Sequence, residues 1–164
     1  MAAINSDARV MEFFRGRLSR VESEAMVDGI EKHFGEYGFG PWAIEVPGVA
    51  AFIGFAGLSH ARFSAHFTPC VEVGWRLAHE HWGHGYATEA ARLALGHGFG
   101  TLALPQVVSY TTATNQRSRA VMERLGMRRD PNEDFDYPAL PEGHLLRRHV
   151  LYRLDSGSYF GSLI

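Results

Sequence analysis

The spacing of apolar residues changes along the chain from a helical period to an extended one. Over residues 10–14, apolar side chains recur three and four positions apart, as they do on one face of a helix. A second helix is predicted over residues 19–34, because Ser19 followed by Glu22 has the spacing of a capping box. We therefore expect two helices before residue 40.

After residue 40, apolar and polar residues alternate, which is typical of strands. Residues 42–46 and 50–58 flank Pro47-Gly48, a turn signal, so they are expected to form a hairpin. The rest of the pattern predicts, in chain order, a strand over 71–77, a glycine-containing loop over 79–85, a helix over 86–99, a strand over 106–113, a short helix over 115–125 and a last strand over 145–154.

The order of these segments predicts the fold class. The strand, helix and strand over residues 71–113 form a crossover unit, which is normally parallel and right-handed, whereas the hairpin before it is antiparallel. The sequence therefore predicts an α/β fold with a central mixed sheet and helices on both faces. A length of 164 residues matches one average domain, so residues 1–164 are expected to form a single domain.

Composition narrows the classes of function. Hydrophobic residues make up 46% and charged residues 21%, which is the balance of a folded globular chain. The formal net charge of −2 argues against a strongly basic nucleic-acid binder. Cys70 is the only cysteine, so an intrachain disulfide and a cysteine-rich metal site are excluded. The chain lacks a secretory signal and an apolar run of about 18 residues, so we expect no membrane partner and a cytoplasmic location.

The stretch from Trp82 to Ala90, WGHGYATEA, carries the strongest chemical signal. It lies between a predicted strand and a predicted helix. Gly83 and Gly85 allow a tight turn and a close approach to a ligand, and the free amides at a helix start form an anion site suited to phosphate. The stretch has no lysine and lacks the glycine spacing of a dinucleotide-binding loop. An ordinary glycine-rich turn is the alternative interpretation.

This stretch resembles the pyrophosphate-binding loop of the GNAT superfamily of N-acetyltransferases, whose pattern is Gln/Arg-x-x-Gly-x-Gly/Ala. Gly85 and Ala87 match the last two fixed positions, and Trp82 departs from the usual Gln or Arg. The form with tryptophan is similar to that of the RimJ/RimL branch, the ribosomal-protein N-terminal acetyltransferases and their relatives. A second motif lies downstream, where the helix that starts at Asn115 and ends in Gly126-Met127 resembles the superfamily's Asn-x-x-Ala/Ser helix ending in Gly-Phe.

The resemblance implies a GNAT-like fold and transfer of an acetyl group from the cosubstrate acetyl-CoA to a primary amine, without a metal. It implies that the pyrophosphate is held by the loop amides of Gly83, His84, Gly85, Tyr86, Ala87 and Thr88. The end of the preceding strand would splay from its neighbour and bind the pantetheine arm and thioester, which assigns this role to Trp75, Arg76 and Leu77. The Leu77 N–H would polarise the thioester carbonyl. Asn115 and Ser118 match positions beside the arm of the cosubstrate.

Acetyl transfer to an amine needs two proton movements, one from the ammonium and one to the leaving thiolate. Many family members use a tyrosine as the acid, but this chain has Met122 at that position. Ser118 stands where RimL-like enzymes place a serine for the thiolate, so we predict that it is the acid. A serine that only hydrogen-bonds the helix backbone is the alternative. Glu72 is the predicted base; a solvated or ion-paired Glu72, His60 or His66 as the base, and a water chain to solvent are the alternatives.

Two other groups of reactive residues are not expected to act. His79, His81 and His84 have short spacings but no set of carboxylates to complete a metal site. Cys70 has no neighbouring base or cation in the sequence, so we expect a half-buried thiol rather than a nucleophile.

The first strand of the family is apparently missing, because the chain begins at what resembles the first helix. The sheet would then have an unpaired edge, which promotes association. We predict that this edge is covered by residues 156–164 or by a second subunit in a homodimer.

The acceptor is expected to be a protein N-terminus or a small-molecule amine such as an amino sugar, polyamine or antibiotic. The alternative function is a CoA-binding sensor or scaffold without catalysis, which Met122 and the missing strand favour.

Overall fold

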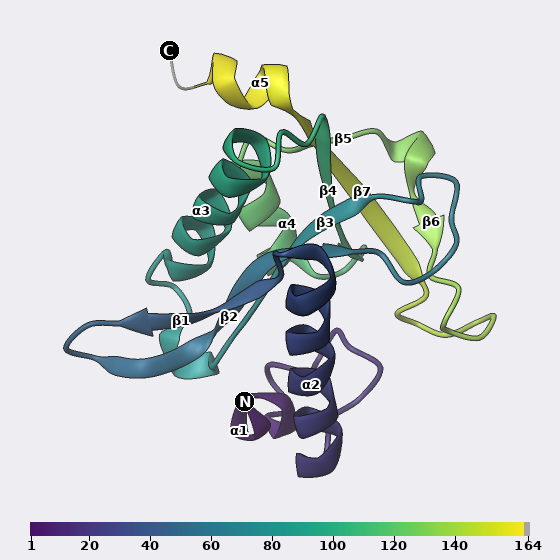
Figure 1. The fold of residues 1–164 in the computed structure, drawn as a ribbon. Coiled ribbons are helices and arrows are strands. Elements are labelled where there is room, and N and C mark those ends of the chain that lie inside the picture. Colours follow the sequence, from purple (N-terminus) through teal and green to yellow (C-terminus); the bar gives the residue numbers. More distant parts are fainter. Residues whose placement is uncertain (163–164) are drawn as a thin grey trace.

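The computed structural model describes residues 1–162 (Figure 1). The helices are α1 (Ala2–Ser6), α2 (Arg20–Tyr37), α3 (Tyr86–Gly100), α4 (Gln116–Arg124) and α5 (Ser156–Gly161), and short 3-10 helices lie at His79–His81 and Pro131–Glu133. The strands are β1 (Pro41–Val46), β2 (Ala50–His60), β3 (Val71–Leu77), β4 (Gln106–Thr112), β5 (Arg128–Arg129), β6 (Phe135–Asp136) and β7 (Arg148–Asp155).

The strands form one mixed sheet with the order β1-β2-β3-β4-β7-β5, and β6 pairs with β7. β3 and β4 are parallel and are joined through α3, while every other strand pair within residues 1–162 is antiparallel. Helices α3 and α4 pack on one face of the sheet, and α2 lies across the other (Figure 1). The predicted mixed α/β fold is therefore confirmed, including its hairpin and its parallel crossover.

The main core lies between the sheet and α3. Ala91, Ala94 and Leu95 are almost completely buried there. Small side chains let the helix lie close to the strands, and a Cβ atom added at Gly98 would come within 3.0 Å of a Leu58 methyl group. This tight packing fixes the start of α3 at the end of β3.

The N-terminal region differs from the prediction. Its first helix is α1, and residues 10–14 form turns and bends instead of the expected helix. The Asp7 carboxylate accepts hydrogen bonds from the Arg9 backbone and side chain, which competes with helical pairing. The buried Val10 and Met11 pack with Ile4 in a separate small cluster, so their spacing reflects this contact rather than a helix face.

The second helix starts as predicted and ends later. Ser19 and Glu22 form the complete capping box. α2 ends three residues beyond the predicted Phe34 because Gly38, with φ of 76°, adopts the left-handed conformation that closes it.

The C-terminal part also differs in detail. The last strand begins at Arg148 instead of residue 145, and Leu145 is 92% exposed. The short strands β5 and β6 were not predicted from the sequence, because two residues are too few for a periodic pattern.

The sheet edge at β1 has no further strand beside it within residues 1–162. The predicted cover by the C-terminal tail is wrong for the part of the tail that the structure describes. Those residues form α5, where Tyr159 packs 4.9 Å from Phe99 between ring centroids and Ser156 bonds to Pro105, next to the start of β4. Residues 163 and 164 lie outside the described residues, and cover by a second subunit stays a prediction.

Candidate active site

Two cavities meet at the end of β3. The first, here called the loop cavity, has a volume of about 720 Å³ and lies between the Gly83–Thr88 loop and α4. The second, the sheet cavity, has a volume of about 570 Å³ and lies between α2 and the strands β2, β3 and β4. Both cavities are lined by Phe13, Phe14, Trp75, Arg76, Asn115 and Ser118. A molecule in one cavity therefore reaches a molecule in the other at this shared wall.

The loop cavity offers a row of unpaired backbone donors. Gly83 and Gly85 have φ of 80° and 86°, a conformation that glycine adopts without strain. Among the described residues, the amides from Gly83 to Thr88 find no protein acceptor, and Gly85 caps α3 without a side-chain bond. Because these amides sit at the positive end of the helix dipole, the loop suits an anion with several oxygens.

β3 separates from β4 directly beside this loop. The two strands share one residue pair, Glu72 with Val108, while β3 stays paired with β2 as far as Leu77. The Ser109 hydroxyl donates to the Val73 carbonyl at 2.9 Å, so Val73 faces β4. The amide of Ala78 faces β2, since it donates to Ile53.

Peptide groups alternate in direction along a strand, so those of Trp75 and Leu77 point into the gap between β3 and β4. The Leu77 carbonyl accepts the Trp82 indole N–H at 2.9 Å. Trp82 thus ties the end of β3 to the loop, which gives a structural reason for tryptophan at the position where the family pattern has Gln or Arg. The backbone geometry agrees with the splay expected for residues 75–77.

A chain of polar side chains lies on the shared wall. The Asn115 amide oxygen caps α4 by accepting from the Ser118 N–H, and its Nδ2 donates to Thr111 Oγ1 at 3.0 Å and to Ser118 Oγ at 3.1 Å. The Ser118 hydroxyl therefore accepts from Asn115, and its own proton has no acceptor within residues 1–162. Met122, four residues later, is buried in the core and also lines the sheet cavity, but its thioether has no proton to donate.

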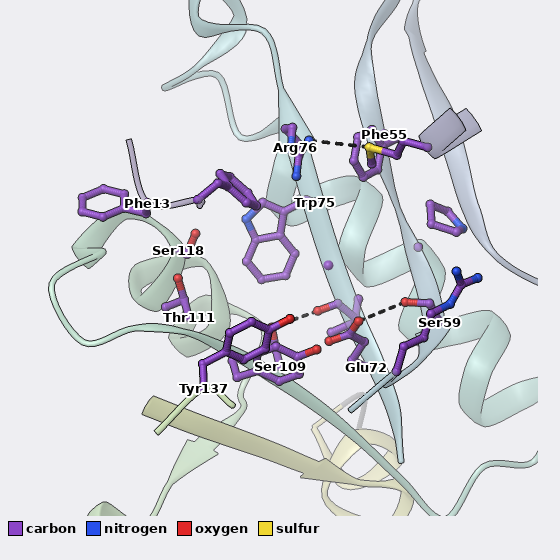
Figure 2. Close-up of a pocket in the computed structure, with 18 of the residues that line it drawn as sticks. Phe13, Phe55, Ser59, Glu72, Trp75, Arg76, Ser109, Thr111, Ser118 and Tyr137 are labelled. Carbon is purple, nitrogen blue, oxygen red and sulfur yellow. Dashed lines mark hydrogen bonds between the residues drawn. The ribbon is translucent and has the colours of Figure 1, made fainter. Parts of the chain in front are cut away.

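The sheet cavity contains a half-buried carboxylate, that of Glu72. Glu72 accepts a hydrogen bond from Ser59 at 3.2 Å and another from Tyr110. Burial raises the pKa of Glu72, and these two hydrogen bonds oppose that shift. The aromatic rings of Tyr137 and His149, with centroids 5.0 Å apart, line the same cavity. Figure 2 shows Glu72 between Ser59 on one side and Tyr137 and Ser109 on the other.

The structure separates the predicted candidates for the base. His60 lines the sheet cavity, but its Nδ1 lies 3.3 Å from His33 Nε2, and burial lowers the pKa of His60. His66 is not among the residues that line either cavity and packs against Phe67. Glu72 and Ser118 are brought to the same cavity, so the two predicted catalytic residues lie on one continuous surface.

Neither the metal interpretation nor the thiol interpretation gains support. Over the part of the chain that the structure describes, no group of three or more His, Cys, Asp or Glu residues could hold a metal ion. Burial raises the pKa of the Cys70 thiol to about 11, so it stays protonated near neutral pH. No described helix is long and apolar enough to cross a membrane.

Sequence reasoning missed the wall formed by the N-terminal segment. Phe13 and Phe14 cover the junction of the cavities, and both are held by arginines. The Arg76 guanidinium lies 4.0 Å from the Phe14 ring centroid, and that of Arg117 lies 5.4 Å from the Phe13 centroid. The spacing of apolar residues over 10–14 predicts a helix, and it gives no indication that these side chains line a cavity.

Comparison with known proteins identifies similar chains. Residues 1–128 match the family described as "Acetyltransferase (GNAT) domain". The uncharacterized protein YkkB of Bacillus subtilis is 28% identical over 122 residues, which cover 74% of this chain and 70% of YkkB. The FsC-acetyl coenzyme A-N(2)-transacetylase of Aspergillus fumigatus is 32% identical over 97 residues, which cover 52% of this chain and 41% of that protein.

Solved structures have the same fold. An acetyltransferase from Agrobacterium tumefaciens superimposes with a TM-score of 0.73 at 27% identity, covering 93% of this chain and 81% of the other. A spermidine N-acetyltransferase from Vibrio cholerae, in complex with CoA and spermine, also has a TM-score of 0.73, covering 97% of this chain and 89% of the other. Its identity of 16% supports a common fold alone.

Proposed function

Because this chain belongs to the GNAT acetyltransferase family and is an acetyl-CoA-dependent N-acetyltransferase, we propose that acetyl-CoA occupies the loop cavity and the acceptor amine the sheet cavity. The observation that carries the proposal is that the two cavities meet at Ser118 and the end of β3. The amine then attacks the thioester directly, in a complex that holds both substrates at once. The finer assignment to the RimJ/RimL-like branch rests on the loop and helix motifs and is part of this proposal.

The proposed cosubstrate site uses the unpaired backbone donors. The diphosphate lies against the amides from Gly83 to Thr88, and the pantetheine arm lies in the gap beside Trp75, Arg76 and Leu77. The thioester carbonyl accepts the Leu77 N–H, which stabilises the negative charge that develops on this oxygen. Asn115 lies beside the arm and orients Ser118.

The proposed chemistry combines proton transfers with the formation of a C–N bond and the breaking of the C–S bond. Glu72, directly or through water, takes one proton from the ammonium, and the free amine attacks the carbonyl carbon. The tetrahedral intermediate expels the sulfur and the C–S bond breaks. The Ser118 hydroxyl donates its proton to the thiolate and takes up the remaining extra proton of the attacking nitrogen, directly or through water. The products are a neutral N-acetylated amine and CoA, and Glu72 then releases its proton to solvent.

An assay of thiol release from acetyl-CoA with a panel of amines tests this function. The panel contains peptides with free N-termini, amino sugars, polyamines and amino acids. We expect CoA thiol to be released only when one class of acceptor amine is present. CoA binding without turnover on any acceptor would contradict the enzyme proposal and support the binding-module alternative.

Replacing Ser118 by alanine should lower kcat about 100-fold, because general acid catalysis contributes at least this factor. CoA affinity should change by less than about tenfold, since a neutral hydrogen bond contributes about 0.5–1.5 kcal/mol. Ser118→Thr keeps the hydroxyl and should recover most of the activity. Steady-state kinetics and calorimetric titration with CoA measure both quantities, and an unchanged kcat in Ser118→Ala would remove Ser118 from the mechanism.

Replacing Gly74 by valine should block the acceptor and spare the cosubstrate. Gly74 lines the sheet cavity on β3, and a Cβ atom there would meet no atom within 4 Å. The isopropyl group would fill space that the acceptor needs. Overpacking of this kind costs about 1–3 kcal/mol, and the same loss of binding free energy for the amine corresponds to roughly a 10- to 100-fold higher KM. CoA affinity and melting temperature should stay near those of the wild type. An unchanged KM would show that the acceptor binds elsewhere.

A further inference from the structure

Two side chains of opposite charge lie on one face of β3 without pairing with each other. Glu72 and Arg76 both line the sheet cavity, and Gly74 lies between them. Four residues along a strand separate their Cα atoms by about 13 Å. Figure 2 shows Glu72 and Arg76 at opposite ends of the cavity. The absent Gly74 side chain leaves the space between the charges open.

Arg76 is a half-buried cation without an anion among the described residues. Its Nη1 donates to Asn5 Oδ1 at 2.7 Å, and the guanidinium lies between the Phe14 and Phe55 rings, at 4.0 and 5.5 Å from their centroids. Burial lowers the pKa of Arg76 to about 10, so it remains charged at neutral pH. No carboxylate of residues 1–162 forms an ion pair with it.

The unpaired edge of this guanidinium has the geometry of a carboxylate site. Arg76 Nε is buried and has no hydrogen-bond partner, and Nη2 donates to no residue within the described chain. Nε and Nη2 form the planar fork that binds carboxylates through two parallel hydrogen bonds. A buried donor without an acceptor is costly, and an oxygen anion at this edge would satisfy it.

Glu72 is the opposite case, because it is a half-buried carboxylate whose partners are the neutral hydroxyls of Ser59 and Tyr110. An isolated charge in a protein interior is unfavourable unless an opposite charge accompanies it. Three arginines that line the cavity form no ion pair with a described residue, and two of them, Arg15 and Arg62, are exposed to solvent. Arg76 is therefore the cation of this lining that most needs an anion, as Glu72 is the carboxylate that needs a cation. A ligand that carries both charges would neutralise each of them.

We propose that the acceptor is a small zwitterion, an amine that also carries a carboxylate. This inference rests on the proposed function, because the amine is the group that is acetylated. The ammonium lies on the Glu72 side of Gly74, and the carboxylate binds Arg76. A polyamine would bring a second cation towards Arg76, and the N-terminus of a protein would leave Arg76 without an anion, so both fit this cavity less well.

The test compares acceptors that differ only in the carboxylate. L-amino acids, β-alanine and 4-aminobutanoate are each assayed against the corresponding amide and the amine that lacks the carboxylate. We expect kcat/KM to be at least tenfold higher for the best acid than for its amide, as for one charged hydrogen-bonded pair. In Arg76→Gln this ratio should fall towards one.

Arg62→Gln is the matched control, because Arg62 also lines the sheet cavity but is exposed and bonds to the Gly29 carbonyl. It should change the ratio less than about twofold. If Arg76 only holds Phe14 and Asn5 in place, Arg76→Gln lowers activity on acids and amides equally and the ratio stays the same. That result would overturn the inference, and so would a ratio that collapses in Arg62→Gln instead.

Calorimetric titration of the same acids and amides into the protein with CoA bound separates the two proposals. Amides that are acetylated as well as acids would overturn the zwitterion inference and leave acetyl transfer intact. If no acceptor is acetylated, the proposed function fails, and the titration still decides the inference. Binding of acids but not amides then supports it, and equal or absent binding of both contradicts it.

Discussion

Replacing Glu72 by glutamine is expected to lower kcat/KM for the acceptor amine by about 10²- to 10⁴-fold, the contribution typical of a general base. Burial raises the pKa of Glu72 above its usual value of 4.5. The wild-type rate should therefore rise with pH through this raised pKa, as the carboxylate forms, and the variant should lose that part of the profile. A pH series of kcat/KM measures both effects.

The same substitution should not destabilise the fold. A carboxyl group whose pKa is raised by folding destabilises the folded state progressively as pH rises above its unfolded pKa, until the folded group is also ionised. Glutamine carries no charge, so Glu72→Gln should unfold at the wild-type temperature or a higher one at pH 8.

Glu45→Gln, on the exposed side of β1 and outside both cavities, is the matched control for Glu72→Gln and should keep full activity. An unaltered pH profile in Glu72→Gln would instead assign the base to His60 or to solvent.

Replacing Gly85 by valine is expected to weaken CoA binding by about 10- to 100-fold or more. Gly85 has φ of 86°, which a β-branched residue adopts only with strain, so the loop amides must move. Each hydrogen bond from an amide to a charged oxygen is worth about 1.5–3 kcal/mol, and losing one reduces affinity by this factor. Calorimetric titration with CoA measures the change.

Gly126→Val separates binding from stability. Gly126 has nearly the same conformation, with φ of 78°, and at both positions a Cβ atom meets nothing within 4 Å. The two variants should therefore lose similar amounts of stability, about 1–2 kcal/mol or more. CoA affinity in Gly126→Val should remain close to wild type. An equal loss of affinity in both variants would mean that the Gly83–Thr88 loop is not the diphosphate site.

The sequence alone was sufficient to predict the elements with strong periodicity. The alternation over Val71–Leu77 matched β3 residue for residue, and the alanine-rich stripe predicted α3 to within one residue. In each of these elements one face is buried in the core, so the pattern of apolar residues appears within a short stretch of sequence. The capping box of α2 was predictable for the same reason, since Ser19 and Glu22 are neighbours in the chain.

What could not be predicted depends on contacts between distant residues. Arg76 lies beside Asn5, Phe14 and Met26. In the sequence, Asn5 is 71 positions and Met26 is 50 positions away from Arg76. No spacing in the sequence indicates that this arginine lacks a carboxylate partner. The turns over residues 10–14 also follow from packing against α1, so helical spacing was misleading there.

The single residue pair between β3 and β4 has a thermodynamic consequence. Backbone hydrogen bonding is nearly interrupted there, so the antiparallel half that contains β1 to β3 and the half that contains β4 and β7 are joined largely through side-chain packing in the core that they share with α3 and α4. The cosubstrate arm, in the position we propose for it, would act as a substitute strand and bridge both halves. The bound cosubstrate would then raise the unfolding free energy with the logarithm of its concentration, by about 2.7 kcal/mol at one hundred times the dissociation constant. Fluctuations that part the halves should be largest in the ligand-free protein, so a shortage of CoA would expose the folded chain to opening at this gap.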